Sequence, residues 1–173
     1  MTMPKALGQI PIYYNHLNTG RPVPEGVKEY RKYQSNYIDV RNDPLYPFGY
    51  GLSYTTFEYG KPRLSGTTMN ANGTLTLTVN VKNTGDREGT EVVQIYVKSL
   101  DNPDAPIKSL KGFQRVDLKA GQSRKVKISL DADAFAYYDE SVDEVAPRKG
   151  RYQILYGNSS ADADLKAIDF EVL

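Results

Sequence analysis

The stretch TLTLTVNVKN, residues 74–83, alternates strictly between apolar and polar side chains. In a strand its four apolar side chains would all face one way, and these residues are Leu75, Leu77, Val79 and Val81. A period of two is typical of a β-strand with one buried face and one solvated face. This stretch therefore predicts an antiparallel sheet that covers a hydrophobic core on one side.

Six further segments have strand patterns bounded by turn residues, and they are residues 56–64, 91–100, 107–118, 123–130, 151–157 and 165–173. We expect a bend at Gly112 and a single turn or short helix in 131–140. No amphipathic helix of ten or more residues separates the strands, which argues against a parallel α/β fold. The pattern predicts an all-β, immunoglobulin or fibronectin type III-like antiparallel β-sandwich of about seven strands. Tyr152 opens the penultimate strand, where such sandwiches carry the tyrosine-corner residue.

Charge and composition exclude several classes of function. The formal net charge of the 173 residues is +1, and no stretch approaches the roughly 20 apolar residues that cross a bilayer. We therefore expect no nucleic-acid partner and no membrane partner. The absence of cysteine excludes disulfides and thiolate metal sites. His16 is the only histidine, which excludes a multi-histidine metal centre, and we expect no metal or cofactor.

Two segments look at first like catalytic or ligand-binding motifs, but neither matches the known pattern of such a motif. Six acidic residues between 131 and 144 lack the ligand spacing and central glycine of a calcium loop. The segment GYGLS, residues 49–53, lacks both the lysine of a phosphate loop and the second glycine of a nucleophile elbow. Sequence alone cannot single out, among the 21 acidic residues, two carboxylates for glycoside chemistry, and we assign no catalytic residue from these motifs.

The N-terminal third has a different texture from the strands. PLYPFGYGLSYTTFEYG, residues 44–60, contains four tyrosines and two phenylalanines among three glycines and two prolines. Each such ring offers roughly 150–250 Å² of surface for burial. We therefore expect the segment to lie against another body through a set of docking residues, namely Tyr46, Phe48, Tyr50, Tyr54 and Phe57.

The residues before this segment are also rich in tyrosine and aperiodic. Tyr30, Tyr33 and Tyr37 have helical spacing, although a turn or irregular coil fits equally well. We expect residues 1–55 to form an irregular extension made to pack on a larger body. A second copy of the chain is another candidate for that body, so a homodimer is plausible.

These segments resemble a known family. PLYPFGYGLSYTTFEY closely resembles the junction before the C-terminal domain of glycoside hydrolase family 3 enzymes, such as β-glucosidases and β-xylosidases. GQIPIYYNHLNTGRP (8–22) resembles a segment slightly upstream, where the second catalytic-region domain ends. NTGDREGTEVVQIYV (83–97), residues 110–140 and GRYQILYGNSSADADL (150–165) resemble the fibronectin type III-like domain of these enzymes.

The resemblance implies a division of the chain and an accessory role. Residues 1–55 correspond to the tail of an upstream catalytic-region domain and a docking linker, and residues 56–173 to the fibronectin type III-like sandwich. The family's catalytic carboxylates belong to upstream domains, so this chain alone is predicted to be inactive, and a β-linked saccharide is met only through the parent enzyme. The resemblance also implies a periplasmic or secreted parent, although residues 1–16 show no signal peptide.

Two alternatives remain open from sequence. A carbohydrate-binding module would present tyrosine rings on one rigid face of the sandwich. A free-standing adhesion or scaffold domain would have an N-terminal third that folds without a partner.

Overall fold

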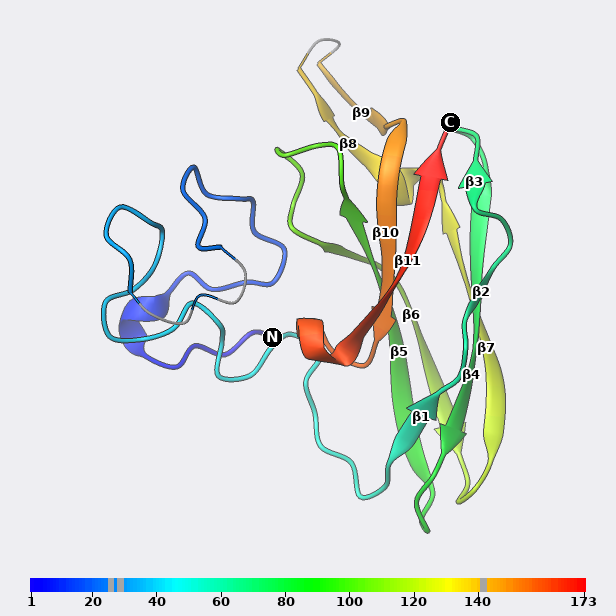
Figure 1. Ribbon diagram of the computed structural model, residues 1–173. Helices are drawn as coiled ribbons and strands as arrows, with labels where there is room; N and C mark the ends of the chain where they lie inside the picture. The colour runs from blue at the N-terminus through cyan, green and yellow to red at the C-terminus, as the bar shows by residue number, and fades with distance from the viewer. Residues whose placement is uncertain (25–26, 28–29, 141–142) are drawn as a thin grey trace.

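The chain folds into a β-sandwich with an irregular extension at its side (Figure 1). The computed structural model describes residues 1–24, 27, 30–140 and 143–173. Its strands are β1 (Phe57–Tyr59), β2 (Arg63–Leu64), β3 (Thr68–Met69), β4 (Thr74–Asn83), β5 (Gly89–Ser99), β6 (Ser109–Leu118), β7 (Ser123–Asp131), β8 (Ala136–Asp139), β9 (Glu144–Pro147), β10 (Gly150–Gly157) and β11 (Leu165–Val172). Three short 3-10 helices are η1 (Leu7–Gln9), η2 (Ala132–Phe135) and η3 (Asp162–Asp164). Among the described residues, no helix is long and apolar enough to cross a membrane.

Two sheets face each other across the core. In the first sheet β4 pairs with β7 along one edge and with the short strands β1 and β2 along the other. The second sheet has the order β3-β11-β10-β5-β6 and is antiparallel except where β3 meets β11. The hairpin β8–β9 projects from one end of the sandwich (Figure 1). This architecture confirms the predicted fibronectin type III-like all-β sandwich.

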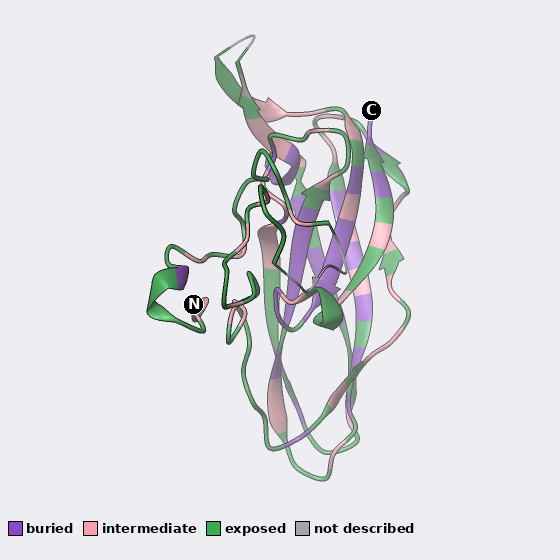
Figure 2. Cartoon of the chain, turned by 60° about the vertical axis from the view of Figure 1, so that its left-hand side comes forward, coloured by how far each residue is buried: buried purple, intermediate pink, exposed green. Residues whose placement is uncertain are grey.

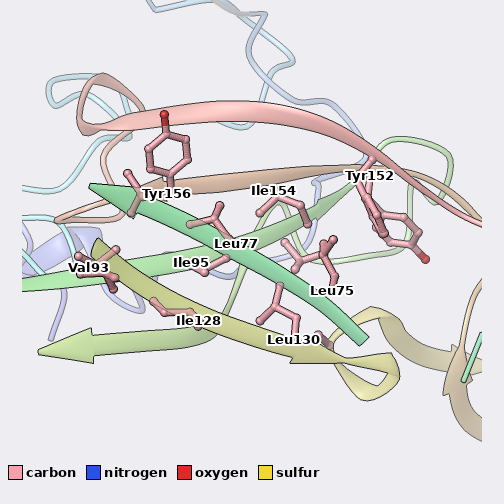
Figure 3. Packing of buried hydrophobic residues seen from close by; sticks show 14 of the residues in the cluster. Leu75, Leu77, Val93, Ile95, Ile128, Leu130, Tyr152, Ile154 and Tyr156 are labelled. Atoms are coloured by element: carbon pink, nitrogen blue, oxygen red, sulfur yellow. The ribbon is translucent and has the colours of Figure 1, made fainter. Parts of the chain in front are cut away.

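The alternation of β4 sets the register of the core. Leu75, Leu77 and Val79 lie opposite Leu130, Ile128 and Val126 of β7, and all six side chains are buried. They meet the inward face of the other sheet, where Val93, Ile95, Tyr152, Ile154 and Tyr156 are buried as well (Figure 3). Because β4 and β7 bury alternate residues against the other sheet, the period of two in their sequences follows from this interface.

Some sequence expectations need correction in detail. The segment 56–64 is two short strands rather than one, and the break falls at Gly60–Pro62, because proline has no N–H for the ladder. The segment 131–140 contains the short helix η2, but it continues as strand β8. The bend expected at Gly112 coincides with a register shift between β5 and β6, and a Cβ there would lie 2.7 Å from Ile128 Cγ2. Tyr30, Tyr33 and Tyr37 lie in irregular coil rather than in a helix.

Candidate functional site

The candidate site is the extension, residues 1–55, which we call the arm. Its aromatic junction is attached to the sandwich where Gly49 crosses the side chain of Gln94. Gly49 has a φ of +81°, and a Cβ at this position would lie 2.5 Å from Gln94 Nε2. Next to it, the carbonyl of Phe48 accepts a hydrogen bond of 2.8 Å from the amide of Ser160. Only glycine satisfies both the backbone conformation and the close approach.

Gln94 cannot easily move aside, because both ends of its amide are engaged. Its Nε2 donates a hydrogen bond to the Asn158 carbonyl, and its Oε1 accepts one from the Tyr96 hydroxyl, both at 2.5 Å. Gln94 and Tyr96 are buried although their positions on β5 face outward from the core. The arm therefore covers part of the outer face of the five-stranded sheet.

A second anchor comes from Tyr14, which lies far from the junction in sequence. Its ring stacks on Phe48 at 4.6 Å between centroids and meets Tyr96 edge-on at 5.6 Å. The Leu110 amide donates a hydrogen bond of 3.3 Å to the Tyr14 hydroxyl. Two residues further on, the His16 carbonyl accepts a hydrogen bond from Ile107. The arm is thus held at two points that are about 30 residues apart along the chain.

A third anchor joins the end of the arm to the first sheet. The Thr55 hydroxyl donates to Asn83 Oδ1 at 2.6 Å, and both side chains are buried. Asn83 Nδ2 in turn donates to the carbonyls of Arg87 and Leu118. This network fixes the direction in which the chain enters β1, where Phe57 packs against the core.

Most of the arm is exposed (Figure 2), and between and beyond these anchors its exposed residues include many with apolar side chains. Of the 21 large hydrophobic residues that are exposed in the described part of the chain, 15 belong to the arm. Leu52 is 90% exposed and Tyr54 is 92% exposed, although both lie between fixed points of the junction. Tyr46 and Tyr50 stack on each other at 5.1 Å and remain half exposed. The arm therefore leaves a large apolar surface uncovered.

The five predicted docking residues fall into two groups. Phe48 and Phe57 are partly buried against the chain's own sandwich. Tyr46, Tyr50 and Tyr54 stay exposed and are available to another body. The sequence reasoning missed Tyr14, Gln94 and Thr55, which hold the arm in place. The signal that could have pointed to Gln94 is the nearly unbroken apolar run VVQIYV, because such a run indicates a strand covered on both faces.

No group of three or more histidine, cysteine, aspartate or glutamate residues in the described part of the chain could hold a metal ion. A cavity of about 440 Å³ in the arm is lined by Asp43 and Asp162, but each carboxylate is paired, with Lys5 and Lys108 respectively. Burial alone would raise the pKa of Asp43, but the contacts with Lys5 and Arg41 outweigh it and hold that pKa below its usual value. A general acid needs a raised pKa instead.

The fold and the arm together define a fibronectin type III-like sandwich that carries a partly uncovered aromatic junction. Residues 91–160 match the family model described as "Fibronectin type III-like domain". The chain is 42% identical to a "Periplasmic beta-glucosidase" of Salmonella typhimurium over its whole length, which is 22% of that protein. It is 39% identical to a "Beta-xylosidase" of Formosa agariphila, over 99% of this chain and 22% of that one.

A solved β-glucosidase from Listeria innocua superposes with a TM-score of 0.90 at 39% identity, covering 99% of this chain and 24% of that chain. The chain therefore belongs to the glycoside hydrolase family 3 enzymes, as a C-terminal, fibronectin type III-like part of them. It spans about a fifth of the length of the curated relatives that it matches.

Proposed function

We propose that this chain is a non-catalytic accessory part that docks on, and stabilises, the catalytic domains of a family 3 β-glycosidase. The single observation that carries the proposal is the arm, which is anchored to the sandwich yet exposes 15 large hydrophobic side chains. The parent activity would be hydrolysis of terminal β-linked glucosides or related glycosides by two carboxylates on other domains. Because a relative is named as periplasmic, the same export is proposed for the parent.

Burial energetics favour docking over solvation of these rings. Fully burying one large apolar side chain contributes roughly 1.5–3 kcal/mol. Leu52, Tyr54 and the Tyr46–Tyr50 pair would together gain several times that amount on contact with a complementary surface. The segment from Tyr50 to Tyr54 lies between the Phe48–Ser160 backbone hydrogen bond and the Thr55–Asn83 side-chain hydrogen bond, which reduces the conformational entropy that it loses on docking.

A sugar-stacking module is less well supported. Among the tyrosines of the sandwich, Tyr96, Tyr152 and Tyr156 are buried, and Tyr59 and Tyr137 are partly buried. The exposed rings of the described sandwich residues are Tyr138 on β8 and Phe113 on β6, which are different elements. A flat aromatic platform needs several rings on one face, and the sandwich does not offer them.

The experiment is reconstitution from two pieces. The Salmonella typhimurium relative is prepared without the region equivalent to this chain, and this chain is titrated into it. We expect a complex whose dissociation constant rises at least tenfold, or about 1.4 kcal/mol, when Tyr50, Leu52 and Tyr54 are all changed to serine. We also expect the chain alone to leave a nitrophenyl β-glucoside unhydrolysed.

Val145→Ser is the matched control, because Val145 is 69% exposed but lies on the distant hairpin strand β9. It should bind as the unaltered chain does. If the triple variant binds as tightly as the unaltered chain, the arm is not part of the interface. Turnover by the isolated chain above a heat-killed sample would refute the non-catalytic role.

A further inference from the structure

The outer face of the first sheet carries a cluster of positive charge that the docking role does not use. Four side chains form it, and we call them the cationic face: Arg63, Lys82, Lys125 and Lys127. All four are exposed. The sheet pairing places them on one surface, because Thr78 of β4 lies between Arg63 of β2 and Lys127 of β7, and Asn80 lies opposite Lys125.

The cationic face lacks the compensation that is usual for a solvated sheet. None of its four members forms an ion pair within the part of the chain that the structure describes. Two acids share this side of the sheet: Glu58 lies opposite Lys82 at the β1 edge, and Asp131 lies opposite Thr74 at the far end of β7. Like charges on neighbouring strand positions repel, so the cluster weakens the fold slightly unless something anionic covers it. Six of the chain's 21 acidic residues lie between 131 and 144, and the others are spread along the chain.

The polar side chains among these cations suit a hydroxyl-bearing ligand. Thr78 and Asn80 lie in the middle of the face, and their side chains make no hydrogen bond to another described residue. Neighbouring strands lie about 5 Å apart and alternate residues about 7 Å apart. The face is therefore a flat grid of cationic groups and neutral hydrogen-bonding groups at spacings comparable with those of sugar rings.

Other polyanions fit the cationic face less well. The outward positions of β4 and β7 contain no aromatic residue, whereas single-stranded nucleic acid is bound by stacking on such rings. The face is broader than the two-stranded ribbon that the major groove of duplex DNA admits, and its residues named above include no apolar side chain that would insert into a lipid surface. In Figure 1, β2, β4 and β7 lie on the side of the sandwich away from the arm, so docking through the arm leaves the face open.

We propose that the cationic face binds an extended polysaccharide that carries carboxylate groups, with Arg63, Lys82, Lys125 and Lys127 contacting the carboxylates and Thr78 and Asn80 the hydroxyls. Such a contact would hold the enzyme on an acidic glycan while the catalytic domains act elsewhere. It differs from ring stacking, because charge rather than aromatic surface supplies the attraction.

The test is a titration of the folded chain with polygalacturonate, with fully methyl-esterified polygalacturonate as the neutral probe. We expect saturable binding to the acidic polymer alone. The binding should weaken at least fivefold as salt rises from about 0.01 to about 0.1 M, where the Debye length falls from about 30 to about 10 Å. The double variant Lys125→Glu/Lys127→Glu should bind at least tenfold more weakly.

The control double variant is Lys98→Glu/Lys149→Glu, which changes the net charge equally at exposed positions off the cationic face. It should keep its affinity within about twofold, and circular dichroism should show both variants folded. Equal losses in the two variants would reduce the effect to net charge and overturn the proposal. Absence of binding at low salt, equal binding of the esterified polymer, or tighter binding of a DNA duplex would overturn it as well.

Discussion

At the scale of the residue, Gly49 is the position where the arm and the sandwich depend on each other most directly. Gly49→Ala places a Cβ in the left-handed region and within 2.5 Å of Gln94, whose amide is held by Tyr96 and Asn158. We expect a loss of about 2 kcal/mol, since the left-handed backbone alone costs roughly 1–2 kcal/mol for an L-residue. The strain acts at the junction, so hydrogen exchange of the Ser160 amide, which donates to Phe48, should rise before the core strands respond.

Gly51→Ala provides the control, because an added Cβ at Gly51 meets no atom within 4 Å and its φ lies outside the left-handed region. Its Ser160 exchange and its melting temperature should match those of the unaltered chain. If Gly49→Ala also leaves both unchanged, the arm is not held at Gly49.

The candidate site was foreseeable from the sequence only in part. Rings among glycines and prolines indicated a segment that must lie against something; Tyr46, Tyr50 and Tyr54 are exposed, and their docking stays a prediction. The same composition could not separate these three rings from Phe48 and Phe57, which pack on their own sandwich. The distinction depends on long-range contacts, such as the stacking of Tyr14 on Phe48, for which no local pattern exists.

At the scale of the element, strand β10 is joined to the loop before it by the hydroxyl of Tyr152. This hydroxyl donates a hydrogen bond of 2.7 Å to the carbonyl of Arg148, as expected for a tyrosine corner. Tyr152→Phe removes the donor from a buried position, so we expect a loss of about 1–2 kcal/mol in the free energy of unfolding. Chemical denaturation of the variant and the unaltered chain measures it.

Tyr137→Phe in β8 is the matched control. The Tyr137 ring lies parallel to that of Tyr152 at 6.4 Å, but its buried hydroxyl has no hydrogen-bond partner among the described residues. Removing that hydroxyl should be neutral or slightly stabilising, because no bond is lost and a buried polar group is removed. Equal destabilisation by the two variants would mean that ring packing, not the corner hydrogen bond, explains the loss.

The strands were predictable from the sequence where the alternating pattern extends over many residues. β4 and β7 were placed correctly because apolar and polar residues alternate along most of β4 and from Val126 onward in β7. The two-residue strands β2 and β3 were missed as separate elements because a strand that short has no period to detect. The hairpin β8–β9 was missed because its pairing lies outside both sheets and no hydrophobic face is required of it.

At the scale of the whole molecule, the sandwich has a core rich in buried tyrosine hydroxyls. Its stability is therefore expected to fall as the pH rises into the alkaline range. Burial raises the pKa of Tyr137 and of Tyr152 to about 12. Burial also raises the pKa of Tyr59, Tyr96 and Tyr156, and for Tyr59 the nearby carboxylate of Glu91 adds to the effect. In each case the folded state favours the neutral phenol more strongly than the unfolded state does.

The direction of the pH effect follows from these raised values. The unfolded chain releases the phenol protons at about pH 10, whereas the folded chain retains those of Tyr137 and Tyr152 to about pH 12. The stability linked to these groups is therefore complete below about pH 10 and is lost as the pH rises toward 12.

We expect the five phenols to ionise together with the loss of the sandwich's circular dichroism, rather than before it. Tyr137→Phe, which removes one of the five without removing a hydrogen bond, should move that transition to slightly higher pH. Complete development of phenolate absorbance for all 14 tyrosines while the circular dichroism is still native would show that the core rings are open to solvent, contrary to the packing of Tyr152 against Phe135 and Tyr137.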